Sequence, residues 1–355
     1  GLGVQAGLQT QGQEAIAIGY ASGQISQGTR GISVGYWAGR TNQGAGSIAI
    51  GDQAGSNGQI ANSIAIGVQA GLTSQGNLSI ALGFQAGQTN QGQFSMALGY
   101  QAGLNNNAAE NVFIGVQAGL ASTNTSSTIA IGAYALATNS IGTALTAIGR
   151  GALYNNTASL NTAVGFEAGY SNTSGQQLVL LGSRAGRANT TGTGNTFVGW
   201  ETAISNTTGA NNVAMGTQTL IVNSTGSNNT AIGTNALFNN INAPHNTSIG
   251  AGSMFYNTTG QLNTAVGSSA LEGSGPAAAS VGNKNVAIGA QALYDNSGDH
   301  NVAVGYQALS ANTTGGNNTA VGWYALKANT TGGANTAVGT GALYANTTGG
   351  SNTAV

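Results

Sequence analysis

The stretch S-I-A-I-G at Ser47–Gly51 decides the fold, because the same five-residue phrase recurs along the whole chain. It is repeated unchanged at Ser63–Gly67, and it returns as N-T-A-V-G at Asn161–Gly165 and Asn335–Gly339. Each copy runs from a small polar residue through an apolar residue or Thr, usually Ala, and an aliphatic residue to Gly. We number positions from that glycine as zero, so the aliphatic residue is −1 and the small polar residue is −4.

The closing glycines are regularly spaced. They fall 16 residues apart from Gly3 to Gly115, and 16 or 17 apart from there to Gly267. One step of 22 leads to Gly289, and steps of 16 or 17 follow as far as Gly339. A fixed period that is sustained along a chain indicates a solenoid, in which each repeat packs only on its neighbours. We therefore predict one continuous β-solenoid over residues 1–355.

The same spacing divides the predicted solenoid into sections. Residues 1–115 form 16-residue repeats, 116–271 form mainly 17-residue repeats, and 283–355 form repeats of 16 or 17. We expect the extra residues, at 272–282, to form a loop insertion at one turn. The chain begins and ends inside a repeat, whereas solenoids need polar caps at free ends. We therefore expect it to be a fragment of a longer polypeptide.

The composition excludes several classes of protein. Gly contributes 60 of the 355 residues, but the two prolines and the absence of a G-X-Y period exclude collagen. A hydrophobic content of 40% with a net charge of −1 argues against disorder. Seven Lys and Arg cannot form the cationic surface that nucleic acid requires. There is no Cys for a disulfide or thiolate metal site, and apolar stretches such as 129–137 are far shorter than the ~20 residues that span a bilayer.

The phrase predicts a strand that is covered on both sides. Side chains of a strand alternate between faces, so −3 and −1 share one face while −2 and the glycine share the other, and both carry apolar or small residues. Position +3 is small, and +4 is Gly early and mostly Leu later, which predicts a second strand. The rest is turn material such as N-T-T-G. We predict an all-β, parallel, two-layered β-roll with one strand-turn-strand-turn coil per 16–17 residues.

Stacking such coils has two further consequences. Equivalent positions lie above one another, so Asn at −4 and in the turns should form ladders whose side-chain amides bond from coil to coil. One coil interior can bury only one face of the strand, so the other face needs a partner, and copies of the same chain supply one. We expect −1 with +4 to fill the coil and the other face to meet neighbouring subunits, although the reverse assignment fits the pattern too.

Local motifs that suggest chemistry have simpler structural explanations. Gly31–Gly35 spells G-x-S-x-G, but a catalytic triad needs a nearby His, and His245 and His300 are more than 200 residues away. Asp295, Asp299 and His300 share one turn, which we interpret as an ordinary solvated turn rather than a metal site. We therefore expect no catalytic, cofactor-binding or metal-binding residue, no cofactor and no enzymatic activity.

Three repeated surface features remain. Aromatic residues recur at +1 and +5 and could stack on sugar rings, although we favour a role in covering the edge of the roll or filling grooves between subunits. Thr recurs at −3, as on ice-binding faces, but alternates with Ile and Val. N-x-S/T sequons would accept glycans only on a eukaryotic secretory route and are otherwise turn residues. They are numerous and include those at Asn189, Asn206, Asn257, Asn312, Asn329 and Asn346.

The repeat resembles a known group of surface proteins. S-I-A-I-G with its 16-residue period is similar to the head repeats of YadA-like trimeric autotransporter adhesins. The later N-T-A-V-G arrays with N-T-T-G turns resemble phage tail fibres and fibre or surface proteins of giant viruses. The resemblance covers essentially all 355 residues and implies a left-handed parallel β-roll that trimerises along its axis and serves in attachment. The neck, stalk and membrane anchor of the adhesins have no match in this sequence, which favours the viral or phage fibre.

From these observations we expect a non-enzymatic structural fibre or attachment shaft of a virion, phage or cell surface, located outside the cell or on a virion. The alternatives are a bacterial trimeric adhesin head that binds host matrix and an ice-binding β-solenoid. The expected partners are copies of the same chain, in a homotrimer or filament, and a surface glycan or receptor. We expect neither nucleic acid binding nor membrane insertion.

Overall fold

The computed structural model describes residues 1–273, 275 and 281–355. In this part of the chain the fold is all-β without a helix, and parallel strands stack into a β-solenoid of about 20 turns with ~17 residues per turn. The prediction of an all-β parallel solenoid is therefore confirmed. Two compact units, Gly1–Gln176 and Gln177–Val355, are distinguished by their internal contacts; we call them the N-terminal and C-terminal units. A single continuous solenoid over 1–355 stays a prediction.

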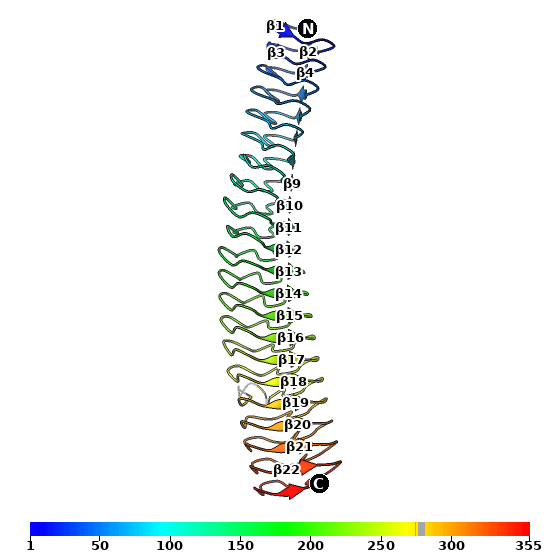
Figure 1. The fold of residues 1–355 in the computed structure, drawn as a ribbon, viewed down its shortest axis with the longest axis vertical. Coiled ribbons are helices and arrows are strands. Elements are labelled where there is room, and N and C mark those ends of the chain that lie inside the picture. The colour runs from blue at the N-terminus through cyan, green and yellow to red at the C-terminus, as the bar shows by residue number, and fades with distance from the viewer. Residues whose placement is uncertain (274, 276–280) are drawn as a thin grey trace. The chain divides into compact units, whose positions relative to one another are not determined.

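In the N-terminal unit, each strand of the main ladder pairs in parallel with the strand of the next coil, beginning with β2 and β4 (Figure 1). Equivalent residues face one another, as Ala49 faces Ala65. The described strands of this unit are β1 (Gln9–Gln11), β2 (Ile16–Ile18), β3 (Ile25–Gln27), β4 (Ile32–Val34), β5 (Ile48–Ile50), β6 (Ile64–Ile66), β7 (Ile80–Leu82), β8 (Met96–Leu98), β9 (Val112–Ile114), β10 (Ile129–Ile131), β11 (Thr146–Ile148) and β12 (Thr162–Val164).

The C-terminal unit repeats this arrangement in its own ladder (Figure 1). Its register is kept across the 22-residue step, because Thr264 of β18 faces Val286 of β19. The predicted loop insertion at 272–282 falls mainly outside the described residues, since 274 and 276–280 are not described. The described strands of this unit are β13 (Val179–Leu181), β14 (Thr196–Val198), β15 (Val213–Met215), β16 (Thr230–Ile232), β17 (Thr247–Ile249), β18 (Thr264–Val266), β19 (Val286–Ile288), β20 (Val302–Val304), β21 (Thr319–Val321), β22 (Thr336–Val338) and β23 (Thr353–Ala354).

Most coils carry one strand where the sequence pattern suggested two. The strand covers −3 to −1, and the residues from +1 to +4 form consecutive turns. A second strand pair is found in the first coils, between Gln9–Gln11 and Ile25–Gln27, and it continues as isolated bridges from Ile25 to Thr89. The small residues at +3 and +4 thus form a tight turn on the inside of the coil rather than a strand.

The glycine at position zero is required by its backbone conformation and by its neighbour. Gly51 has φ +129, and a Cβ at this position would lie 2.7 Å from the carbonyl oxygen of Gly67 in the next coil. The same approach is found at Gly233, where a Cβ would lie 2.7 Å from Gly250. Residues with a side chain rarely adopt this φ. The atoms that a Cβ would meet belong to the main chain of the next coil, which cannot move aside. This explains why the phrase always ends on Gly.

The interior of each coil is lined by −4, −2, +3 and +4. Ala49 at −2 and Ala54 at +3 are fully buried, and so is Leu237 at +4 of a later coil. The expectation that −1 fills the coil is wrong, because Ile50 is 38% exposed and its equivalents are exposed or half-buried. Strand alternation therefore places −1 and −3 on the outside. The expectation that +4 lies inside is confirmed.

Leucine at +4 occupies a backbone conformation that usually favours glycine. Leu237 has φ 50 and Leu293 has φ 51, and both side chains are fully buried. The left-handed conformation costs roughly 1–2 kcal/mol for a residue with a Cβ. Burial of a Leu side chain contributes about 1.5–3 kcal/mol. The buried aliphatic group thus offsets the backbone cost, and the early coils avoid the cost by using Gly at +4.

Amide side chains form the predicted ladders inside the coils. In the turns, Asn223 Nδ2 donates to Asn206 Oδ1 at 2.7 Å, and Asn240 Nδ2 donates to Asn223 Oδ1 at 2.9 Å. At −4, the backbone N–H of Asn212 donates to Asn195 Oδ1 at 2.9 Å, and the pattern repeats to Asn352. These amides satisfy buried donors and acceptors of the adjacent coil, as buried polar groups require, although Asn240 Oδ1 is buried without a partner.

Candidate functional site

The outward face of the strands carries a file of aliphatic side chains at −1, which are exposed or half-buried. At −1 the exposed residues of the N-terminal unit include Ile50, Leu82 and Leu98, and those of the C-terminal unit include Met215 and Ile288. The residues at −3 on the same face are mostly half-buried. Because the strands are in register, these side chains lie side by side at the strand spacing of ~4.8 Å. Single exposed aliphatic groups are common on proteins, but a contiguous file marks a surface for contact.

Aromatic side chains stack along the turns of the N-terminal unit. The rings of Tyr20 and Tyr36, both at +1, are stacked with centroids 5.4 Å apart. Trp37 stacks on Tyr36 at 5.0 Å, and the guanidinium of Arg40 lies 4.4 Å from the Trp37 ring. Stacked rings and cation–π contacts each contribute about 0.5–1.5 kcal/mol. The rings thus cover one another from coil to coil.

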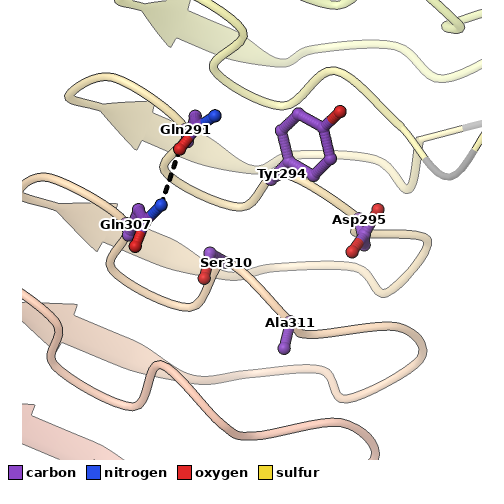
Figure 2. Close-up of a pocket in the computed structure, with 6 residues that line it drawn as sticks. All are labelled: Gln291, Tyr294, Asp295, Gln307, Ser310 and Ala311. Carbon is purple, nitrogen blue, oxygen red and sulfur yellow. Dashed lines mark hydrogen bonds between the residues drawn. The ribbon is translucent and has the colours of Figure 1, made fainter.

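The C-terminal unit has a group of aromatic residues beside a hollow. Tyr324 lies 5.6 Å from Tyr306 and 4.9 Å from Trp323, measured between ring centroids. Lys327 Nζ lies 4.2 Å from the centre of the Tyr324 ring. The hollow has a volume of about 320 Å³ (Figure 2). Its lining is Gln291, Tyr294, Asp295, Gln307, Ser310 and Ala311.

Two ionisable groups in this hollow have perturbed pKa values. The pKa of Tyr294 is raised, first by the negative charge of Glu272, then by burial and by Asp295. The Tyr294 hydroxyl donates to Glu272 Oε1 at 3.4 Å. Burial also raises the pKa of the Asp295 carboxyl above its ordinary value, because less water solvates the charged form. The hollow therefore combines acidic and neutral polar groups.

The G-x-S-x-G stretch is part of the interior. Ser33 at −2 is fully buried. Its hydroxyl donates to Gln43 Oε1 at 2.7 Å and accepts from Gln27 Nε2 at 3.3 Å. Ser33 thus replaces the usual Ala and joins the amide side chains of two coils, which is a structural role.

The turn with Asp295, Asp299 and His300 does not bring its ionisable residues together in one hollow. Asp295 lines the hollow of Figure 2, whereas Asp299 and His300 line another beside Lys284. Asp299 Oδ1 accepts a hydrogen bond from the backbone N–H of Asn283 at 2.6 Å. Among the described residues, no group of three or more His, Cys, Asp or Glu could hold a metal ion.

Of the sequon asparagines named above, those of the complete coils belong to the buried ladder. Asn206, Asn312 and Asn329 are fully buried, as are Asn189 and Asn257. The amide of Asn329 donates to Asn312 Oδ1 at 2.8 Å and to the carbonyl of Gly332 at 2.9 Å. In the last coil, Asn346 is half-buried and bonds to Asn329 in the same way. The buried amides are hydrogen-bonded turn residues, whereas Asn228 and Asn317, which also begin N-x-T sequons, are exposed.

The threonines at −3 lie on the outward strand face, mainly in the C-terminal unit. Thr230, Thr247 and Thr264 stand in consecutive coils and are half-buried. Val213 precedes them and Val286 follows at the same position. The Thr file is therefore three coils long here, and it is flanked by the exposed aliphatic residues at −1.

Comparison with known proteins adds no further assignment. No protein-family model and no curated protein matches the sequence. In the described part of the chain, no helix has the length and apolar character needed to cross a membrane.

Two features escaped the sequence patterns. The sequence pattern assigns Gln at +8 of the early coils to the turns, yet Gln59 Nε2 donates to Gln75 Oε1 at 3.1 Å and to the carbonyl of Ile48 at 2.8 Å. The recurrence of Gln at intervals of 16 residues was the available signal. The hollow at Ser310 was also missed. An alignment of the repeats on their glycines would show it, because Ser310 stands at +5 where Tyr294 stands in the preceding coil.

Proposed function

We propose that the chain is a non-enzymatic structural shaft or attachment fibre that associates with copies of itself through the outward strand face. The observation that supports this most directly is the file of aliphatic residues at −1, such as Ile50 and Leu82, which are each 38% exposed. Burying such side chains against a partner contributes about 25 cal/mol per Å² of apolar surface. The proposed partners are two further copies in a parallel homotrimer, because equal coils present equal faces at equal heights.

The interior supports a mechanical role. Each coil is fixed to its neighbours by strand pairing and by amide ladders such as Asn206–Asn223–Asn240. Such a stack resists local separation of coils, because each opened coil leaves several buried polar groups without partners. We place this shaft outside the cell or on the surface of a virion or phage. There, resistance to proteases and detergent is useful.

The oligomeric state tests this proposal. Sedimentation equilibrium of the whole chain at micromolar concentration should give three times the chain mass. The double variant Ile50→Lys, Leu82→Lys should shift the population toward monomer, because it places charges on the strand face. Ile60→Lys is the matched control, since Ile60 is exposed but lies outside the strand. A monomeric wild-type chain, or equal effects of Ile50→Lys with Leu82→Lys and of Ile60→Lys, would refute the association.

Ice binding is the second candidate, and the outward Thr230, Thr247 and Thr264 favour it. Regularly spaced hydroxyls on parallel strands could order water, although the file is interrupted by Val213 and Val286. Thermal hysteresis separates the two proposals. A freezing-point gap that disappears in Thr247→Lys would favour ice binding over the shaft.

A further inference from the structure

The hollow of the C-terminal unit lies on the turn side of the coils that follow Gly289 and Gly305. It forms because +5 and +6 change from large to small residues between successive coils: Tyr294 and Asp295 are followed by Ser310 and Ala311. The two coils are held together by backbone bonds, including Asp295 N–H to the carbonyl of Ser310 at 3.2 Å. The hollow is therefore a gap in a side-chain row on a fixed scaffold.

Its polar groups offer both donors and acceptors at close range. Gln307 Nε2 donates to Gln291 Oε1 at 2.6 Å, so the two amides are held as a pair on one side (Figure 2). Tyr294 and Asp295 lie on the other side, and Ser310 lies below them (Figure 2). Carboxylate, amide and hydroxyl groups together satisfy a ligand that carries several hydroxyls, each of which both donates and accepts.

Tyr294 is the aromatic residue of the lining, and further aromatic residues follow in the same coil as Gln307 and in the next one. Tyr306 directly precedes Gln307 in the chain, and Trp323 and Tyr324 lie in the next coil. Trp323 is 54% exposed and Tyr306 is 43% exposed. Small-ligand sites combine aromatic and apolar walls with a few placed polar groups, and in this hollow Tyr294 and Ala311 supply the walls. A pyranose ring has the complementary character, with C–H groups on its faces and hydroxyls on its rim.

We propose that this hollow binds one neutral hexose unit of a surface glycan. The volume of about 320 Å³ lies at the lower end of ligand pockets, which suits a single sugar ring rather than a longer segment. The carboxylate of Asp295 in the lining, and that of Glu272, which bonds to the Tyr294 hydroxyl, disfavour an anionic sugar by charge repulsion. No Lys or Arg is among the residues that line the hollow. The hollow therefore selects a neutral ring by its hydroxyls.

This inference concerns the turn side of the coil, whereas self-association uses the strand face. It deepens the attachment role of the proposed function but does not depend on trimer formation. Sedimentation of the variants below reports on association, and sugar binding reports on the hollow, so failure of one is distinguishable from failure of the other.

Saturation-transfer NMR with the methyl glycosides of glucose, galactose, mannose and N-acetylglucosamine tests the site, with N-acetylneuraminic acid as the anionic probe. At least one neutral glycoside should show transfer to its ring C–H protons, with millimolar affinity. Ser310→Tyr should abolish the signal by filling the hollow. Tyr already stands at +5 in Tyr294 and Tyr344, so the fold accepts it. Asp295→Asn should weaken binding roughly tenfold, the value of a hydrogen bond to a charged group.

Ile221→Tyr is the matched control, because Ile221 is also at +5 of the C-terminal unit but does not line the hollow. It should leave the transfer signal unchanged. The proposal is overturned if none of the neutral glycosides gives a signal, if N-acetylneuraminic acid binds as well as they do, or if Ser310→Tyr keeps full binding. Equal loss in Ile221→Tyr and Ser310→Tyr would overturn it too.

Discussion

The coils around Gly51 and Gly233 have the same strand register, but their interiors are filled differently. The early coil has Gly55 at +4 and the amide of Gln59 reaching across the interior. The later coil has a buried Leu at +4, and the shorter Asn240 bonds to the ladder from the turn. The early interior is filled by a long amide side chain in place of an aliphatic one. The later interior is filled by an aliphatic side chain, whose residue adopts a less favourable backbone conformation. The constant elements are the glycine at zero and the Ala at −2.

The largest effect should come from the element that both kinds of coil share. Gly51→Ala and Gly233→Ala would each place a Cβ 2.7 Å from the backbone of the next coil, and both have φ near +130. We expect each to lower the free energy of unfolding by at least about 3 kcal/mol. Urea denaturation followed by circular dichroism measures the change. Gly341→Ala is the control, with positive φ but no atom within 4 Å. Equal costs at Gly341 and Gly51 would show that the close approach is unimportant.

The second test removes a buried aliphatic side chain at position +4 and leaves the amide ladder unchanged. Leu237→Ala should lower the free energy of unfolding by about 2–4 kcal/mol, because it leaves a cavity in a fully buried position. Leu262→Ala should change it by less than about 0.5 kcal/mol, since Leu262 is 50% exposed. Both residues have positive φ, so the pair separates burial from backbone strain. Similar midpoints in thermal denaturation of the two variants would contradict this account of position +4.

The third test compares the two kinds of amide. Asn223→Ala removes the side chain between Asn206 and Asn240, and Gln75→Ala removes the one between Gln59 and Gln91. Each should cost about 1–3 kcal/mol, because buried donors and acceptors lose their partners. Hydrogen exchange should show faster exchange in the coils on either side. A neutral effect at Gln75 with a large one at Asn223 would mean that the long amide only fills space.

The smallest effect concerns a side chain outside the interior. The pKa of Asp295 is raised by burial, so its ionised form lowers stability above the folded-state pKa. Asp295→Asn should therefore raise the melting temperature slightly at about pH 7, and the difference should shrink as the pH falls below the carboxyl pKa. Thermal denaturation of both proteins at about pH 7 and about pH 3 measures it. A difference in melting temperature that grows as the pH falls would contradict this account.

The period of the glycines was sufficient to predict the solenoid, because stacked coils bring main chain into contact at every sixteenth or seventeenth residue. It could not say which strand face is inside, since Ala at −2 and Ile or Val at −1 are both compatible with burial. Side-chain size does not make the choice, because Phe113 and Phe197 at −2 are as fully buried as Ala49. The left-handed conformation of Leu237 is unfavourable for a residue with a side chain, so backbone preference does not predict it. The burial of the side chain accounts for it. The hollow depends on residues from two coils, so no single repeat could reveal it.

The preserved alignment of β18 with β19 shows that coil length and ladder position are separate properties. Asn285 N–H donates to Asn263 Oδ1 at 2.8 Å across 22 residues, as its equivalents do across 16 or 17. The amide ladder therefore joins successive coils in the same register whether 16, 17 or 22 residues separate the two asparagines. Peptide grafted at that corner, whether by evolution or by an engineer, would decorate the solenoid without disturbing the coils on either side.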